Sequence, residues 1–340
     1  MDILSYILSK KYTDRKINEL PHYDHEKGEY VGLGKFWNSL RCGHKSTVEF
    51  YNYDISTSSA GTKKDDNEGL VCVPSTNTVK NQNDYENIGL YMSVDVNGYV
   101  DANDDYHVTA IKGDGRFRND GTNGDVYVMA MPGYIKWHFG EETWSISYAD
   151  VMYPGYEIID EAVKPDDTIR PFLLHAKYVA GRNPHENNKL ASISGVMPQY
   201  VGMSHDGQIT EFKSKGPQYS GKTSHDDFYV QLMMWLKYAT THSQSVMRGA
   251  CDGYYLQYKN IVEEMGVKRV ILTNAQADNL LIGSCVSIGD YDGGTINADR
   301  AVAQNFNVAN RVMVNNIEDI GDGKSAVYVN SVNTFNTTLT

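Results

Sequence analysis

The residues of this chain that could do chemistry occur in short polar clusters. Ser204, His205 and Asp206 stand side by side. A catalytic triad instead draws its members from separate elements that converge in space. The surrounding Gly-x-Ser-x-x-Gly also departs from the G-x-S-x-G nucleophile elbow. We interpret this cluster as a polar turn.

Two histidines have a spacing that invites a metal. His22 and His25 lie in "NELPHYDHEKGEY", which is flanked by Pro and Gly. Metal motifs such as H-E-x-x-H hold their ligands on a rigid helix, and this segment has no helical pattern. We therefore expect a solvated linker and no metal site.

Two turn-rich stretches resemble ligand loops without meeting their requirements. "DVNGYVDANDD", residues 95–105, has the Asp and Asn content of a calcium loop, but Tyr99 occupies a ligand position and Gly98 comes too early. Asn-Gly favours a type I′ turn, so we predict a hairpin turn at Asn97-Gly98. "GDGRFRNDGTNGD", residues 113–125, lacks the Lys-Ser/Thr of a phosphate loop and precedes a strand. We expect no cofactor.

Composition excludes several classes of partner. The 340 residues carry a net charge of -12, and no basic cluster is longer than two residues. Nucleic-acid binding needs a cationic surface, so we expect neither nucleic acid nor an anionic membrane surface as partner. The four cysteines form no C-x-x-C pair, which favours buried thiols in a reducing cytosol.

One segment predicts a strongly apolar helix. In "SHDDFYVQLMMWLKYATTHSQ", residues 224–244, Ser224 and Asp227 resemble a capping box. The apolar run is 12 residues long, whereas a membrane span needs about 20. We therefore predict a helix buried on nearly all sides, with no membrane insertion and with Trp235 in the core. Its expected face comprises Phe228, Leu232, Trp235, Leu236 and Ala239.

Most of the remaining chain reads as strands and turns, so we predict a β-rich α+β fold. The expected parts are an N-terminal docking helix and linker at residues 1–27, a β-rich domain at 28–110, a mixed domain with the buried helix at 111–266 and a C-terminal β module at 267–340. "CDGYYLQYKNIVEEMG", residues 251–266, is a candidate second helix. "GLVCV", residues 69–73, predicts a buried strand, and "GDGK", residues 321–324, predicts a hairpin.

The chain also contains 25 Tyr and only 9 Phe. A series of aromatic residues at strand spacing suits either cross-strand core pairs or a carbohydrate platform. We favour the core. The series is Tyr127, Tyr134, Trp137, Trp144, Tyr148, Tyr153 and Tyr156.

Several segments together resemble the tail-tip and tail-fibre virion proteins of phages and prophages of Gram-positive hosts. They are "ILSYILSKKYTD", "GDGRFRNDGTNGDVYVMAMPGYIKW", "RPFLLHAKYVAGRN", "LASISGVMP" and "DDFYVQLMMWLKYATTHSQ", followed by "VKRVILTNAQADNLLIGSCVSIGD" and "RVMVNNIEDIGDGKSAVYV". The resemblance implies a C-type-lectin-like domain at residues 111–266. Formylglycine-generating enzymes share that fold, but this chain lacks their paired cysteines, so their activity is not implied.

The resemblance implies a non-enzymatic structural protein of the virion tail that attaches to the host surface and is made in the bacterial cytoplasm. Its implied partners are other tail proteins and a host-surface glycan or protein. By analogy with tail fibres, we expect a homo-oligomer, with a trimer favoured. Two alternatives stay open: a tail-associated glycan or cell-wall hydrolase, and an architectural collar or baseplate component.

We expect the ligand-binding residues in two polar loops, "NPHENNK" at residues 183–189 and "SHDGQ" at 204–208, with two tyrosines as aromatic anchors. Tyrosine gives a large contact area at low entropic cost. The alternative is that these loops are ordinary solvated connections. The candidate residues are Asn183, His185, Asn187, Tyr200, His205, Asp206 and Tyr219.

Overall fold

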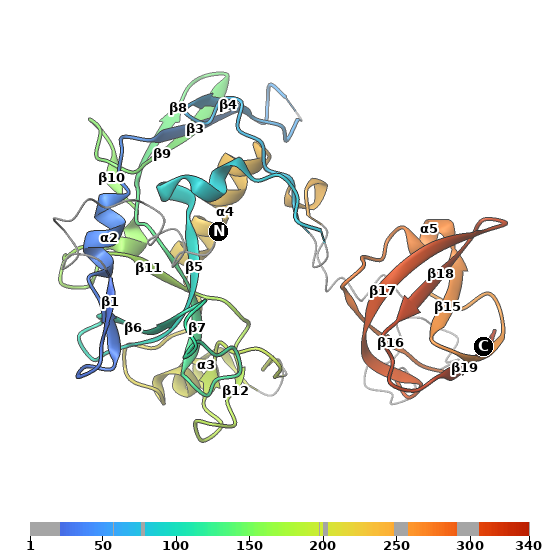
Figure 1. Ribbon diagram of the computed structural model, residues 1–340. Helices are drawn as coiled ribbons and strands as arrows, with labels where there is room; N and C mark the ends of the chain where they lie inside the picture. Colours follow the sequence, from blue (N-terminus) through green and yellow to red (C-terminus); the bar gives the residue numbers. More distant parts are fainter. Residues whose placement is uncertain are drawn as a thin grey trace. The chain divides into compact units, whose positions relative to one another are not determined.

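The structure is a computed structural model that describes residues 21–56, 58–75, 79–196, 198–199, 203–247, 258–290 and 306–339. The predicted N-terminal docking helix lies outside this range. The described residues form a β-rich α+β fold of antiparallel sheets with four α-helices (Figure 1). They divide into two compact units. The first comprises Met1–Cys72 and Asn83–Thr241, and the second Val73–Gln82 and His242–Thr340.

A five-stranded sheet in the first unit alternates between a polar and an apolar face. Val48 pairs with Ile146 on the buried face, and their neighbours Thr47 and Ser147 pair on the other. This period of two is the pattern of a sheet that packs on one side only. The strand order is β10 (Glu157–Ile158), β8 (Tyr134–Phe139), β9 (Thr143–Ala149), β3 (Lys45–Tyr51) and β4 (Thr62–Asp65).

The second large sheet of this unit has four strands, in the order β11 (Leu173–Ala176), β7 (Asp125–Ala130), β5 (Ser93–Val100) and β6 (Tyr106–Ile111). β7 pairs with β5, so the sheet contains residues from both sides of the boundary expected at residue 110. Both large sheets contribute to one hydrophobic core.

The turn predicted at Asn97-Gly98 is wrong. Both residues lie inside β5, where the register with β6 shifts and forms a bulge. A Cβ on Gly98 would lie 2.3 Å from the carbonyl oxygen of His107, so the glycine permits close backbone approach. The chain turns at residues 101–105 instead, where an Asp101 carboxylate oxygen accepts the backbone N–H of Asn103 and of Asp105, each at 2.9 Å.

Smaller elements complete the first unit. His22 lies in a hairpin whose second strand packs against β6, so the predicted solvated linker is wrong. The α2 helix buries Phe36 and Trp37. These elements are β1 (His22–Asp24), β2 (Glu29–Val31), α2 (Leu33–Ser39), η2 (Asp84–Asn87), η3 (Gly89–Tyr91), η4 (Asp160–Ala162), β12 (Gly181–Arg182), β13 (Leu190–Ala191) and α3 (His205–Lys213).

The predicted apolar helix is confirmed as α4 (Ser224–Tyr238), but its burial is one-sided. Its buried residues are Tyr229, Leu232 and Leu236, whereas Val230 is 50% exposed and Trp235 is only half-buried. All-round burial and a fully buried Trp235 were therefore wrong predictions. The expected face is confirmed, because all five of its residues belong to the core or pack against it: Phe228, Leu232, Trp235, Leu236 and Ala239. The helix covers the sheet beside β3 (Figure 1) and leaves its outer flank in solvent.

The ends of α4 are fixed by specific polar contacts. Its capping box uses Thr223 and Asp226, one residue before the predicted pair. At the other end, Ala239 adopts a left-handed conformation and the carbonyl of Leu236 accepts hydrogen bonds from the Asn67 amide at 2.9 Å and the Tyr85 hydroxyl at 3.2 Å. These bonds satisfy carbonyls that a helix end otherwise leaves unpaired.

The second unit contains a four-stranded antiparallel sheet with its own core. The predicted "GDGK" hairpin is confirmed, with Asp322 and Gly323 at positive φ between β17 and β18. The elements are η5 (Ser243–Ser245), β14 (Glu264–Val267), β15 (Arg269–Thr273), α5 (Asn274–Ala277), β16 (Cys285–Ile288), β17 (Ala309–Gly321), β18 (Lys324–Val329) and β19 (Phe335–Thr337).

Three further predictions need correction. In the described part of residues 251–266 there is no helix, and its end is strand β14. Residues 69–73 make only an isolated bridge at Cys72, with Val71 and Val73 exposed. Cys42 and Cys285 are exposed thiols, not buried ones. No helix among the described residues has the length and apolar character needed to cross a membrane.

Candidate binding site

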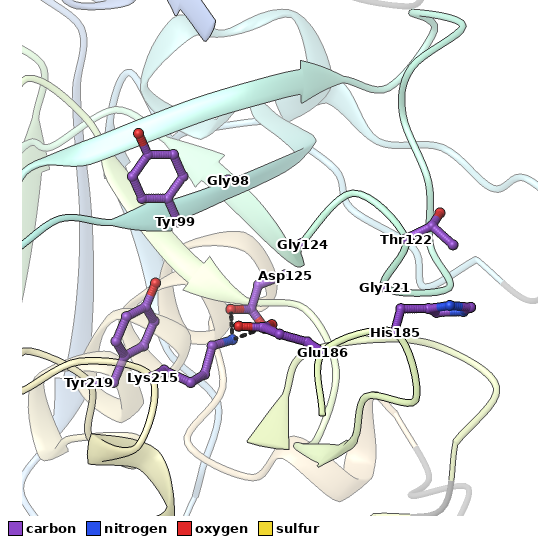
Figure 2. Close-up of a pocket in the computed structure, with 10 residues that line it drawn as sticks. All are labelled: Gly98, Tyr99, Gly121, Thr122, Gly124, Asp125, His185, Glu186, Lys215 and Tyr219. Carbon is purple, nitrogen blue, oxygen red and sulfur yellow. Dashed lines mark hydrogen bonds and ion pairs between the residues drawn. The ribbon is translucent and has the colours of Figure 1, made fainter. Parts of the chain in front are cut away.

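A pocket of about 270 Å³ lies at one end of the four-stranded sheet of the first unit (Figure 2). Its walls come from the end of β5, the turn before β7, the loop between β12 and β13, and the segment after α3. The lining residues are Gly98, Tyr99, Gly121, Thr122, Gly124, Asp125, His185, Glu186, Lys215 and Tyr219. We call this the Tyr-lined pocket.

An ion pair between Asp125 and Lys215 forms the base of the Tyr-lined pocket. Their side chains are only 5% and 6% exposed. One Asp125 oxygen accepts the backbone N–H of Ser192 at 2.8 Å, and the other accepts the Lys215 ammonium and the Tyr127 hydroxyl. Because both oxygens are occupied, Asp125 fixes β7 to its neighbours and is not free to act as a general acid or base.

The Glu186 carboxylate approaches the same ammonium from the opposite loop. Its Oε2 lies 3.9 Å from Nζ of Lys215, and its side chain is 40% exposed. Figure 2 shows the Lys215 amine pointing toward both carboxylates. The base of the pocket therefore presents acceptor oxygens beside a buried cation, within reach of solvent.

Two tyrosines flank this polar base. The Tyr219 hydroxyl accepts the backbone N–H of Val100 at 3.0 Å, which fixes the ring, and burial raises its pKa. Tyr99 is 44% exposed and stacks on His107 with ring centroids 4.7 Å apart. Burial and the nearby carboxylates of Glu29 and Asp101 raise the Tyr99 pKa. Both hydroxyls thus remain protonated at neutral pH.

The predicted loop at residues 183–189 contributes unevenly to the pocket. His185 is exposed and lines it, whereas Asn187 is exposed but outside the lining. Asn183 is fully buried: its amide donates to the carbonyl of Gly121 at 3.2 Å, and its side-chain oxygen accepts the N–H of His185 at 3.0 Å. Asn183 therefore shapes the loop.

Residues 204–208 were predicted as a loop, but they form the start of helix α3. Ser204 caps α3, and His205 and Asp206 form its first turn, with Nδ1 of His205 3.3 Å from the Asp206 carboxylate. Both side chains are exposed and lie outside the lining of the Tyr-lined pocket. Tyr200 lies outside the described residues.

The structure thus brings together His185 and Tyr219, which are 34 positions apart in the chain. Sequence reasoning missed Tyr99, Asp125, Glu186 and Lys215. The turn-rich stretch before Asp125 and the alternation that exposes Tyr99 were visible signals, but only the fold shows that they converge.

The aromatic series has two outcomes. Tyr127 and Tyr148 are buried, as the core interpretation predicted. Trp137 instead lies at the solvent end of the sheet face that α4 covers, with its ring 5.6 Å from that of Phe139, which is 72% exposed. The contacts of Trp137 extend to Trp144, Phe228 and Trp235. This cluster anchors α4 and continues into an exposed apolar edge.

The chemistry of the Tyr-lined pocket suits binding of a small hydroxylated ligand. It offers hydroxyl, imidazole and ammonium groups, carboxylate acceptors and aromatic surface within one hollow. Comparisons with protein-family models, curated protein sequences and solved structures find no match to this chain.

Proposed function

We propose that this chain is a structural protein of a phage tail that attaches the virion to a host-surface glycan through the Tyr-lined pocket. The observation that carries the binding part is the convergence of Tyr99 and Tyr219 with His185 and Glu186 around one polar hollow. The assignment to a phage tail rests on the sequence resemblance alone.

The pocket fits a sugar better than an apolar ligand. Sugars present hydroxyls to polar side chains and C–H faces to aromatic rings. The exposed ring of Tyr99 offers such a surface, and the Glu186 carboxylate is an acceptor close to it in the pocket. Repeated subunits would let weak sites act together, because linkage raises avidity by about 10² to 10⁴. We retain the homo-oligomer, with a trimer favoured, as part of the proposal.

The finer fold assignment is also a proposal. The support for a C-type-lectin-like domain at residues 111–266 is one helix, α4, packed on an antiparallel sheet. Because α4 contacts β3, and both β3 and β4 precede residue 111, such a domain would also need strands from the segment 28–110. Location in the virion tail, contact with other tail proteins and synthesis in the host cytoplasm accompany this assignment.

A glycan hydrolase is the main alternative in another class. Such enzymes place two carboxyl groups about 5–5.5 Å or 6.5–9.5 Å apart, one of them free to donate a proton. In the pocket, Asp125 is held by Ser192, Tyr127 and Lys215. This occupancy favours binding without catalysis. A purely architectural role would leave the pocket without a ligand.

The test is binding of the purified full chain to an array of defined cell-wall glycans and to intact Gram-positive cells. Tyr99→Ala and His185→Ala should each weaken binding by about 10-fold or more, a loss of roughly 1.4 kcal/mol. Tyr53→Ala is the matched control, because Tyr53 is 85% exposed and outside the pocket.

Equal binding by Tyr99→Ala, His185→Ala and Tyr53→Ala would refute the assignment of the pocket. No binding by the intact chain would favour the architectural role. Release of new reducing ends from the glycans would favour the hydrolase.

A further inference from the structure

Three metal-ligating side chains meet in the first unit, away from the residues of the Tyr-lined pocket. Glu161 comes from η4, His175 from β11 and Asp226 from the first turn of α4. Each offers a donor atom, and the three atoms all lie within 4.8 Å of one another. Nδ1 of His175 is 3.0 Å from a Glu161 oxygen and 3.7 Å from an Asp226 oxygen. We call this group the acidic centre.

The polar atoms of the acidic centre are poorly satisfied. The Glu161 side chain is only 7% exposed, and neither of its oxygens makes a hydrogen bond of acceptable geometry within the described part of the chain. The same holds for both ring nitrogens of His175. The 3.0 Å approach of Nδ1 to Glu161 therefore brings two potential ligand atoms together without the alignment of a hydrogen bond.

The acidic centre places two carboxyl groups and one imidazole together in a largely buried position. Burial, and then the charge of Asp226, raise the pKa of Glu161 to about 9. A cation bound between the two carboxyl groups would offset their charge and satisfy their unpaired oxygens.

We propose that Glu161, His175 and Asp226 bind one divalent transition-metal cation of the Zn²⁺ or Mn²⁺ class. One imidazole nitrogen and two carboxylates form a ligand set that suits these ions. With metal–ligand bonds of about 2.0–2.2 Å, neighbouring donors lie about 2.8–3.6 Å apart. The two separations from Nδ1 of His175 are 3.0 and 3.7 Å, and all three donor atoms lie within 4.8 Å of one another, so small side-chain shifts would bring them into this range.

Asp226 and His175 are each oriented by a contact beyond the centre. The second Asp226 oxygen accepts the backbone N–H and the hydroxyl of Thr223 at 2.8 and 2.9 Å, which leaves the first oxygen facing His175. The ring of Tyr229 stacks on His175 with centroids 4.3 Å apart. Preoriented ligands lower the cost of binding an ion. Asp226 is 26% exposed and marks the side from which an ion would enter.

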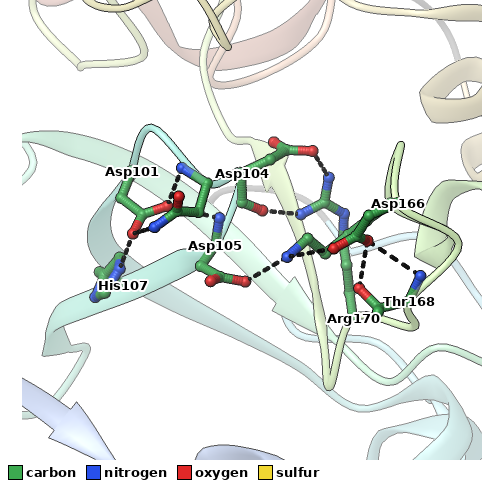
Figure 3. A network of polar contacts seen from close by, with 9 residues as sticks. Asp101, Asp104, Asp105, His107, Asp166, Thr168 and Arg170 are labelled. Atoms are coloured by element: carbon green, nitrogen blue, oxygen red, sulfur yellow. Dashed lines mark hydrogen bonds and ion pairs between the residues drawn. The ribbon is translucent and has the colours of Figure 1, made fainter.

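The segment that carries Glu161 is held by a polar network (Figure 3). The backbone N–H of Arg170 donates to the carbonyl of Ala162 at 2.8 Å, and its guanidinium donates to the carboxylate and the carbonyl of Asp104. Within the same loop, Asp166 accepts the N–H and hydroxyl of Thr168. This network ties η4 to the turn between β5 and β6.

The metal proposal goes beyond the attachment function and does not depend on it. A metal is one way to satisfy the buried oxygens of Glu161, and a proton on Glu161 is another. The two differ in a measurable way, because a metal must displace that proton when it binds.

The experiment uses the full chain, stripped with a chelator and titrated calorimetrically with ZnCl₂ and with MnCl₂ at pH 7. We expect one saturable site for at least one of these metals, with release of about one proton as Glu161 ionises. The proton count comes from repeating the titration in buffers of different ionisation enthalpy.

Glu161→Gln should weaken this binding by about 10-fold or more and abolish the proton release. Asp226→Asn, which can still accept the capping bonds from Thr223, should weaken it similarly. Asp227→Asn is the matched control, because Asp227 is 58% exposed and adjacent in sequence. Far-ultraviolet circular dichroism confirms that each variant is folded.

Failure of both metals to bind the wild-type chain would overturn the proposal. So would unchanged affinity in Glu161→Gln, because the ion would then bind elsewhere. Either result leaves the glycan test unaffected, since that test probes other residues.

Discussion

Asp125 and Glu161 are two buried carboxyl groups of the same unit, with 5% and 7% of their side chains exposed. Asp125 has an ammonium group, a backbone N–H and a hydroxyl as partners. Glu161 has no hydrogen bond of acceptable geometry within the described residues and faces a second carboxylate, Asp226. The two groups are buried to a similar extent, but only Asp125 has hydrogen-bond and ion-pair partners among the described residues.

The difference separates a structural charge from a candidate ligand site. A buried ion needs a counter-ion and hydrogen bonds to offset its lost hydration. Asp125 has both within the chain, and these contacts fix the base of the Tyr-lined pocket. Glu161 is compensated only by taking up a proton or by a cation from outside. Burial alone therefore does not distinguish the two groups, and the missing partners make Glu161 the better candidate for a ligand.

The largest effect is expected from Lys215→Met. Removing the ammonium leaves the buried carboxyl group of Asp125 without its counter-ion, and breaking a buried ion pair typically costs about 3–5 kcal/mol. The free energy of unfolding is measured with urea and tryptophan fluorescence. All four tryptophans, Trp37, Trp137, Trp144 and Trp235, belong to the first unit, so the signal reports on that unit.

Lys222→Met is the control for this prediction. Lys222 pairs with Asp227, and their side chains are 56% and 58% exposed. Exposed pairs contribute about 0–1 kcal/mol, so this variant should unfold almost as the wild type does. If Lys215→Met cost no more than Lys222→Met, the compensation assigned to Asp125 would be wrong.

The second prediction concerns the pH dependence of stability in the presence of a chelator. Folding raises the pKa of Glu161 to about 9, from an ordinary value of 4.5. Between these values the folded chain holds a proton that the unfolded chain has lost. The contribution of Glu161 is therefore fully present below pH 4.5 and is lost as the pH rises toward 9.

Glu161→Gln removes this titration. Between pH 4.5 and about 9, the unfolding free energy of the wild type should fall by up to about 1.4 kcal/mol per pH unit relative to that of the variant. Glu141→Gln, at an exposed position, should follow the wild type at every pH. Parallel stability curves for wild type and Glu161→Gln would show that Glu161 is ionised in the folded chain and that the contrast with Asp125 is false.

The sequence predicted local structure better than it predicted burial. Alternation located the major strands, and Asp322-Gly323 marked a hairpin, because these signals depend on neighbouring residues. The burial of Trp235 depends on where the sheet ends beside α4, which no local pattern records. The turn prediction at Asn97-Gly98 failed for a similar reason, because the close approach of His107 from another strand decides between a turn and a bulge.

The candidate sites show the same limit. His185 and Tyr219 were predicted from their loops, and the fold brings them to one pocket. The acidic centre was not predicted at all, because Glu161, His175 and Asp226 are spread over 66 positions of the chain. The three residues come from three elements that meet only when the core assembles. Such long-range convergence has no signature in a single sequence.

The smallest expected effect concerns the hydroxyl of Thr223, which caps α4 and also contacts Asp226. Thr223→Ala should cost about 1 kcal/mol of unfolding free energy at neutral pH. Hydrogen bonds from Thr223 help to lower the pKa of Asp226. The stabilisation that the folded chain gains from the lowered pKa of Asp226 is fully present above 3.8, the pKa of this group in the unfolded chain. It is lost as the pH falls through the lower pKa of the folded chain. The difference in unfolding free energy between the wild type and Thr223→Ala should therefore become smaller at acidic pH.

Thr273→Ala provides the matched comparison, because Thr273 forms a capping box with the uncharged Gln276 in the second unit. The unfolding free energy that Thr273→Ala costs is followed by circular dichroism. It should not change with pH in this way, because this capping box contains no carboxylate. If the effect of Thr223→Ala were equally independent of pH, then the hydroxyl would stabilise only the helix end. Asp226 would in that case remain ionised without its cap, and the acidic centre would depend less on preorganised partners than its geometry indicates. A pH-dependent difference confined to Thr223→Ala would instead establish that α4 holds Asp226 as the anion of the centre.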